Sequence, residues 1–396
     1  MSILFTPQKI GGVEIKNRFV RAATYEGMAD QSGRVTDELV SVYRRLAQGD
    51  IGLVLSSFMF VHPLGRALHN QLGIHNDDAI PGLFRLAEVV HEGGGKIAFE
   101  ISHSGRQTRP ELIGRRPLGP SAIRRDPTSF IKPAAMTIHE IREVIAAFIA
   151  AAGRSVAAGG DIVYVHAGGG DLLNQFLSPY FNCRTDEWGG SPVNRFRIVR
   201  EIIEGVKASL DNVPILVKMN AQDYTPKPGV TPELAREYAA MLMEIGIDAL
   251  ELTSGTKSYS LMNCWRGEVP IPELLRSLPA WIRPIGRIKL KSWSGKYNLI
   301  EGWNLDYLKV VKPVTGNMAL FLVGGMRRFE HMEQVLIRGE ADFICLCRPF
   351  IRQPDLVKRF IEGAKESTCK SCNRCIGAVA NHIPTCCYFG GLPDKQ

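Results

Sequence analysis

The stretch ALFLVGGMRRFEHMEQVLIRGEADFICLC, residues 319–347, holds the pattern that decides the fold. It contains two short apolar runs, Ala319–Gly325 and Asp342–Cys347, with an amphipathic stretch between them. Short runs that are almost continuously apolar are typical of strands buried on both faces, as strands are in parallel sheets. The segment therefore predicts one strand–helix–strand unit.

The same pair of features recurs along the chain. Six further apolar runs precede these two and bring the total to eight: Arg18–Ala23, Gly52–Ser57, Lys96–Ser102, Asp161–Ala167, Pro214–Asn220 and Ala249–Ser254. Eight strands that alternate with helices predict a closed (β/α)8 TIM barrel of the α/β class. The alternative is an open doubly wound sheet, but no GxGxxG motif follows the first run.

Residues that commonly cap helices stand before four of the amphipathic stretches, at Thr36, Thr137, Ser191 and Thr231. Thr137 and Glu140 have the spacing of a capping box. Ser191 and Thr231 each precede a proline, which is favoured at the first position of a helix. We therefore expect helices to begin at these four points.

Some segments fall outside the repeated unit. The stretch LFTPQKIGGVEIKNRF, before the first run, predicts a β-hairpin that closes the floor of the barrel. Thr108–Ala135 and Gly255–Gly302 follow strand ends, so we expect them to lie over the mouth. We expect residues 1–366 to form the barrel domain and residues 367–396 to form a short Cys-rich extension.

Composition excludes several classes of protein. Of 396 residues, 45% are hydrophobic and 22% are charged, which is ordinary for a soluble globular chain and excludes disordered and fibrous classes. The longest apolar run, Val144–Ala152, is too short for a membrane span, and we see no secretory signal. Nine cysteines without such a signal indicate a reducing, cytoplasmic location.

The net charge is 48 − 40 = +8. The basic residues are scattered, and none of the basic clusters is interleaved with aromatic residues as in a nucleic-acid platform. We therefore expect no nucleic acid as a partner, and the lack of a spanning segment predicts no membrane partner either.

Two strand ends predict a phosphate site. Gly324 and Gly325 follow the seventh run, where backbone N–H groups can approach an anion, and Cys347-Arg348 follows the eighth, where a guanidinium can bind the same phosphate. The alternative is a tight turn beside a surface arginine. In the fifth run, Lys218 interrupts an apolar strand and would stabilise negative charge at the mouth, unless an acid at a strand end neutralises it.

The C-terminal stretch contains Cys369, Cys372 and Cys375, followed by the adjacent pair Cys386 and Cys387. Three thiols at this spacing, with Cys386 as the fourth ligand, suit an iron–sulfur cluster or zinc. Reduced free cysteines are the alternative.

The chain resembles the Old Yellow Enzyme family of flavin-dependent oxidoreductases along nearly its whole length. The matching segments are LFTPQKIGGVEIKNRFVRAATYEGMAD, EISHSGRQ, FLSPYFNCRTDEWGGSPVNRFR, VKMNAQDY, LVGGM and LCRPFIRQPDL. The resemblance implies an FMN-binding barrel whose commonest activity is the reduction of an activated C=C bond by a nicotinamide. The FMN contacts that it carries over are Ala23, Thr24, Tyr25, Ser57, Glu100, Lys218, Gly324, Gly325, Cys347 and Arg348.

The chain departs from the family after the fourth strand. The family has a histidine there, a second histidine or asparagine three residues on, and a tyrosine two residues further. Here His166 remains to hold a substrate oxygen, Gly169 replaces the second polar residue, and Asp171 replaces the proton-donating tyrosine. Asp171 can donate a proton only if its carboxyl stays neutral. The alternatives are a helix-capping aspartate and a packed histidine.

Position 100 also departs, because the family usually has glutamine there. The carboxylate of Glu100 accepts hydrogen bonds but cannot donate one, and it disfavours an anionic reduced flavin. We therefore expect a more reducing flavin than in relatives with glutamine.

These observations predict an FMN-dependent oxidoreductase that acts on a small-molecule substrate with NADH or NADPH and that forms a homo-oligomer. An FMN-dependent amine dehydrogenase or demethylase is one alternative, and a flavin-binding member without turnover is another. The Cys motif resembles that of two larger members of the family, 2,4-dienoyl-CoA reductase and trimethylamine dehydrogenase. Because the chain ends at Gln396, we expect it to lack their second flavin domain.

Overall fold

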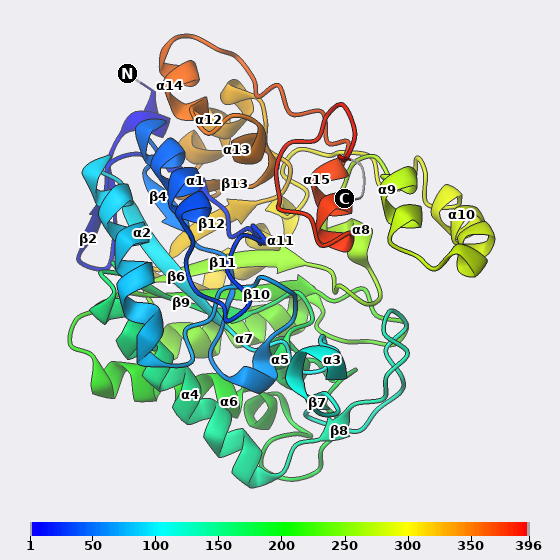
Figure 1. The fold of residues 1–396 in the computed structure, drawn as a ribbon. Coiled ribbons are helices and arrows are strands. Elements are labelled where there is room, and N and C mark those ends of the chain that lie inside the picture. The colour runs from blue at the N-terminus through cyan, green and yellow to red at the C-terminus, as the bar shows by residue number, and fades with distance from the viewer. Residues whose placement is uncertain (1, 394–396) are drawn as a thin grey trace.

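The eight predicted runs form one closed parallel barrel in the computed structural model, which describes residues 2–393 (Figure 1). Its strands are β3 (Phe19–Arg21), β4 (Leu53–Leu55), β6 (Lys96–Ser102), β9 (Ile162–Ala167), β10 (Ile215–Gln222), β11 (Ala249–Ser254), β12 (Ala319–Val323) and β13 (Phe343–Leu346). The strand order is β4-β3-β13-β12-β11-β10-β9-β6, and β6 pairs back onto β4. The (β/α)8 prediction is therefore confirmed, and the open-sheet alternative is wrong.

Two apolar cores explain why the strands are buried on both faces. The inner core fills the barrel with side chains such as Ile162, Leu216 and Phe321, and the outer core lies between the strands and the surrounding helices. The predicted hairpin is present as the antiparallel pair β1 (Gln8–Ile10) and β2 (Val13–Ile15). Ile10 and Ile15 belong to the inner core, so the hairpin closes one end of the barrel.

The helices of the repeated unit cover the outside of the barrel (Figure 1). They are α1 (Asp37–Gln48), α2 (Ile80–Glu92), α4 (Ile138–Ala157), α6 (Pro192–Ser209), α7 (Pro232–Glu244), α11 (Leu305–Val311), α12 (Phe329–Ile337) and α14 (Leu356–Ile361). All four predicted caps are confirmed: the side chains of Thr36, Thr137, Ser191 and Thr231 each accept a hydrogen bond from a backbone N–H of the first helical turn. No helix in residues 2–393 is long and apolar enough to cross a membrane.

The two long insertions extend the mouth of the barrel. The first contains α3 (Pro110–Ile113), β7 (Leu118–Gly119) and β8 (Ala134–Ala135). The second contains α8 (Leu261–Cys264), α9 (Ile271–Arg276) and α10 (Arg283–Lys291). Helix α15 (Arg374–Ala380) of the C-terminal extension packs against α9, on the side of the molecule away from the hairpin (Figure 1). The proposed domain boundary at residue 366 stays a prediction.

Shorter elements complete the connections. Strand β5 (Met59–Phe60) pairs with the end of β6, α5 (Leu172–Leu177) follows β9, and α13 (Arg348–Arg352) follows β13.

The capping box of α4 provides a test of local stability. Thr137 accepts from the N–H of Glu140, whose carboxylate accepts from the N–H of Thr137, and both side chains are near the surface. Replacing Thr137 with Ala should lower the free energy of unfolding by about 1 kcal/mol, because a first-turn donor loses its partner. Urea denaturation measures the change. Thr137→Ser is the control and should retain most of the stability; equal losses in both variants would contradict the capping role.

Candidate active site

A cavity of about 420 Å³ opens at the C-terminal ends of the barrel strands. Most of the predicted site residues line it: Ala23, Thr24, Tyr25, Glu100, His166, Lys218, Gly324, Gly325, Cys347 and Arg348. Of the residues predicted to bind flavin or to act in catalysis, two do not line it. Ser57 is buried beside the cavity, and its neighbour Phe58 forms the wall in its place, while Asp171 is fully buried behind His166.

The predicted phosphate end of the cavity offers donors without partners. Gly325 has φ +71°, and the N–H groups of Gly325 and Met326 donate to no acceptor among residues 2–393. The indole of Trp303 packs against Gly325, so closely that a Cβ there would lie 2.5 Å from the ring. The Nε1–H of Trp303 is buried without a hydrogen-bond partner among the described residues. Unpaired N–H groups on a strand-to-helix turn suit an anion such as the phosphate of FMN.

Arg348 lines the same end and is held in place by segments far away in the sequence. Its Nη1 donates to the carbonyl of Arg266 at 2.8 Å and to the side chain of Asn373. Asn373 in turn donates to the carbonyls of Trp265 and Glu268, both at 2.9 Å. The second insertion and the C-terminal extension therefore fix the guanidinium that was predicted to bind phosphate.

Strand register places a row of charges across the mouth. Lys218 on β10 pairs in register with His166 on β9 and with Glu251 on β11. The Nζ of Lys218 lies 3.2 Å from Glu251 and 3.8 Å from Glu100, and Tyr164 donates to the other oxygen of Glu251 at 2.6 Å. The lysine is therefore neutralised by strand acids, as one alternative held, and it still lines the cavity.

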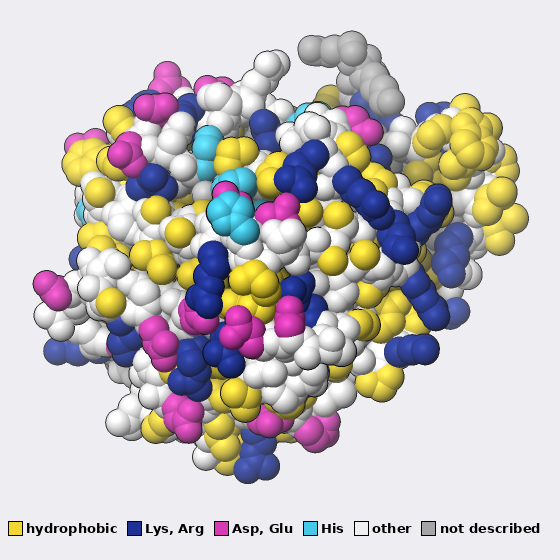
Figure 2. Space-filling model, turned by 90° about the horizontal axis from the view of Figure 1, so that it is seen from below, with side chains coloured by type: hydrophobic (Ala, Val, Ile, Leu, Met, Phe, Trp, Pro, Cys, Tyr) yellow, Lys and Arg dark blue, Asp and Glu magenta, His cyan; other side chains and the backbone are white. Residues whose placement is uncertain are grey.

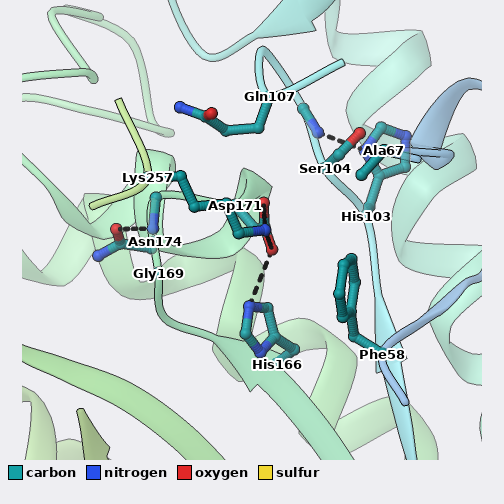
Figure 3. A network of polar contacts seen from close by, with 12 residues as sticks. Phe58, Ala67, His103, Ser104, Gln107, His166, Gly169, Asp171, Asn174 and Lys257 are labelled. Carbon is teal, nitrogen blue, oxygen red and sulfur yellow. Dashed lines mark hydrogen bonds and ion pairs between the residues drawn. The ribbon is translucent and has the colours of Figure 1, made fainter. Parts of the chain in front are cut away.

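His166 continues this row. Its Nδ1 lies 2.7 Å from Glu100. Its Nε2 lies 2.9 Å from Asp171, as Figure 3 shows. The contact with Asp171 is an ion pair, and Nε2 has no well-aligned hydrogen-bond acceptor among the described residues, so its N–H is available to a ligand. Lys257, from the second insertion, donates to both oxygens of Asp171, at 2.9 and 2.7 Å.

Opposite charges decide the protonation states in this row. Burial alone would raise the pKa of Glu100 and lower that of His166, but the two groups face each other, and Lys218 adds to the field on Glu100. The net result is a lowered pKa for Glu100 and a raised pKa for His166. Burial would also raise the pKa of Asp171, yet Lys257 and His166 outweigh it and lower that pKa. Asp171 is thus an anion and lacks the neutral carboxyl that a proton donor requires.

Gly169 leaves room beside His166. A Cβ at this position would lie 3.7 Å from His166 Nε2 and 3.9 Å from the Cε of Lys257. Phe58 packs over His166 with ring centroids 6.1 Å apart, and the Nζ of Lys257 lies 4.6 Å from the centre of the Phe58 ring (Figure 3). Lys257 therefore brings a polar group next to the position where the family has its second oxygen-binding residue.

The structure also locates the C-terminal cysteines. Cys369, Cys372, Cys375 and Cys387 line one small cavity of about 20 Å³. Cys386 instead packs against the outer core, so the predicted fourth ligand lies outside the group and Cys387 shares the cavity. No three His, Cys, Asp or Glu side chains in the described part of the chain could together hold a metal ion. A preformed zinc site is therefore absent from residues 2–393.

Several functional residues escaped the sequence reasoning. Glu251 lies within β11, and Lys257 lies in the loop that follows this strand. Trp303 lies just past the second insertion. The only available signal was their position, since a charged or aromatic side chain after a barrel strand lies near the mouth.

Comparison with known proteins identifies the family. The model of the NADH:flavin oxidoreductase / NADH oxidase family matches residues 3–260. The chain is 32% identical over 387 residues to an NADH oxidase of Thermoanaerobacter brockii, which covers 96% of this chain and 54% of that protein. It is also 32% identical over 383 residues to the 4,4'-dithiodibutanoate disulfide reductase of Rhodococcus erythropolis, covering 95% and 93% of the two chains.

Among solved structures, a complex of 2-naphthoyl-CoA reductase with 2-naphthoyl-CoA matches with a TM-score of 0.84 and 28% identity, over 97% of this chain and 56% of that one. The chain therefore spans about half the length of two of these relatives and nearly all of the third. Because the family model matches well over half of it, the chain belongs to the NADH:flavin oxidoreductase / NADH oxidase family, which confirms the resemblance drawn from its sequence.

Proposed function

We propose that this chain uses FMN and a nicotinamide to reduce an electron-poor C=C bond whose oxygen substituent lies against His166. The observation that carries the proposal is the cavity at the strand ends, where an unpaired anion-binding turn, a buried lysine and a histidine held between two carboxylates line the same walls. Family membership supports the flavin and the nicotinamide.

The residues present fit FMN. Gly325, Met326, Trp303 and Arg348 would hold the phosphate, and Lys218 with Glu100 would face the ring. When bound, FMN supplies hydride transfer from the nicotinamide to the acceptor carbon. Lys218 places a positive charge in the mouth, and its two carboxylate neighbours keep it protonated, since burial alone would lower its pKa and Glu251 and Glu100 raise it. The lower flavin potential expected from Glu100 stays a prediction.

His166 is the proposed proton donor. In its charged form, Nε2–H can bind the acceptor's oxygen and polarise the C=C bond, or deliver a proton as negative charge develops. Asp171 acts on His166 without reaching the cavity, because it is fully buried and ionised. Lys257 would supply the second contact to the oxygen, in place of the side chain that Gly169 lacks.

Disulfide reduction is a second candidate. The relative that this chain matches over 93% of its length is a disulfide reductase. The cavity could serve that reaction as well, since a disulfide that takes up a hydride equivalent and one proton yields two thiols, and His166 could protonate the departing thiolate. The nicotinamide would be the two-electron reductant.

Anaerobic spectroscopy tests the proposal. The protein loaded with FMN should be bleached by NADH or NADPH and should regain its colour with an enone or with an aliphatic disulfide, whichever is the substrate. Colour that neither nicotinamide bleaches would overturn the proposal. If an amine then bleaches the protein, the result supports the dehydrogenase alternative. If nothing bleaches it, the result supports the flavin-binding alternative.

Two substitutions should move the pH profile in opposite directions. If His166 donates the proton, the rate is highest below its pKa and falls as pH rises through it. Asp171→Asn removes an anion that raises this pKa, so the fall should come at lower pH. Lys257→Met removes the cation that shares Asp171 with His166, so the pKa of His166 should rise. The rate should then fall at higher pH than in the wild type.

Rates of acceptor reduction between pH 5 and 10 measure both shifts. Lys257→Arg retains the cation and serves as the control. Shifts of the same sign in both variants would show that His166 is not the titrating donor.

We also propose that the C-terminal thiols bind an iron–sulfur cluster, with Cys387 as the fourth ligand. An iron–sulfur cluster places several metal ions between its thiolates, so its ligands need not converge as they do on one ion. The small cavity would have to widen as the thiols turn inward. Arg352 donates to the sulfur of Cys387 at 3.3 Å and could balance the negative charge of such a cluster.

The adjacent cysteines provide a matched pair of variants. After anaerobic reconstitution with iron and sulfide, Cys387→Ser should lose most of the bound iron and the broad visible absorbance, while Cys386→Ser should keep both. Loss in the Cys386 variant alone would restore the ligand expected from the sequence, and no iron in the wild type would leave the thiols free.

A further inference from the structure

The second insertion carries a strongly basic segment. Residues 274–300 contain six Lys and Arg side chains and no Asp or Glu: Arg276, Arg283, Arg287, Lys289, Lys291 and Lys296. The rest of the chain mixes both signs of charge, with 40 acidic residues in all. Such an excess of positive charge within one short segment indicates an anionic partner.

The helix at the centre of this segment exposes an apolar stripe. Trp281, Ile285 and Ile288 are 78%, 70% and 73% exposed. Their spacing of four and three residues places them on one face of α10 and the turn before it. The basic side chains of Arg283, Arg287, Lys289 and Lys291 are all exposed, and helical spacing places Lys289 and Lys291 on the two sides of this stripe.

The opposite face of α10 fixes the helix on the protein. Leu290 is buried, and a Cβ on Gly286 would lie 2.8 Å from Leu278 and 3.3 Å from Leu275, so this face packs closely on the segment before it. The stripe is therefore exposed on a helix that is already held by its other side. Figure 1 shows α9 and α10 projecting beyond the barrel, and Figure 2 shows hydrophobic side chains gathered on this projecting part with Lys and Arg beside them.

We propose that residues 274–300 dock on an anionic lipid bilayer. An amphipathic helix with a basic polar face and tryptophan on its apolar side lies in the plane of a membrane interface, where its apolar side chains enter the acyl boundary and its cations meet anionic headgroups. Five of the six cations are exposed, all but Arg276, and with no acid in the segment they complement such a surface. Peripheral binding of this kind needs no spanning segment. It departs from the expectation that no membrane is a partner, which came from the lack of such a segment.

A second copy of the chain is a poorer occupant. A two-fold interface sets the same patch against itself, so the cations around the stripe would face cations of the other copy. Like charges across an interface disfavour association. A bilayer that contains anionic lipid has no such penalty.

Vesicle co-sedimentation of the full chain tests the proposal. Wild type should sediment with vesicles of phosphatidylcholine and phosphatidylglycerol at three to one, bind phosphatidylcholine vesicles weakly, and bind less as salt rises. The triple variant Trp281→Ser, Ile285→Ser and Ile288→Ser should lose most of the binding. The charge variant Lys289→Glu and Lys291→Glu should lose roughly tenfold or more.

Matched controls change the same residue types elsewhere. Ile337→Ser with Ile361→Ser alters exposed isoleucines on α12 and α14, and Lys358→Glu with Lys365→Glu alters exposed lysines; both should bind vesicles like wild type. Circular dichroism checks that every variant folds. Three results would overturn the proposal: no sedimentation with anionic vesicles, equal losses in the controls, or a solution mass that falls from oligomer to monomer in the stripe variant, which would assign the face to a second copy.

Discussion

The site depends on the pairing of charges that the barrel buries. Six groups alternate in sign across the mouth, from Glu251 through Lys218, Glu100, His166 and Asp171 to Lys257. An unpaired charge at any of these places would be costly, because burial removes its hydration. Parallel register sets the spacing, since three adjacent strands bring Glu251, Lys218 and His166 to one level. Opposite neighbouring charges thus hold down the pKa of Glu100 and of Asp171 and hold up the pKa of Lys218 and of His166.

This arrangement decides how the proton role is divided. In the family pattern a tyrosine donates the proton, and the aspartate at that position invites the same assignment here. The structure instead surrounds Asp171 with cations and places it out of reach of the cavity. In the proposed function, its negative charge acts through His166, which lines the cavity and whose pKa is raised by Glu100 and Asp171. In this proposal, the aspartate at the tyrosine position thus leaves the role of acid to His166, which it contacts.

The sequence predicted the barrel well because its signals are local. Each strand is a short apolar run, each of four helices has a capping residue in front of it, and Gly324-Gly325 marks the proposed anion-binding turn by itself. The residues it missed depend on contacts between distant segments. Nothing local shows that Lys257 reaches Asp171, that Glu251 neutralises Lys218, or that Trp303 packs on Gly325. Cys386 and Cys387 are adjacent in sequence. Only the path of the folded backbone shows that Cys386 packs against the outer core while Cys387 lies beside the other thiols.

The support of Arg348 has a consequence for assembly. The guanidinium is held by Asn373 from the C-terminal extension and by the carbonyl of Arg266 from the second insertion, with Asn373 also bonded to the insertion backbone. The C-terminal extension, which follows the barrel in the sequence, would thus complete the proposed phosphate clamp. If Arg348 binds the phosphate, a chain still emerging from the ribosome would have a finished barrel but a loose clamp, so tight capture of the cofactor would come only after the segment around Asn373 is synthesised.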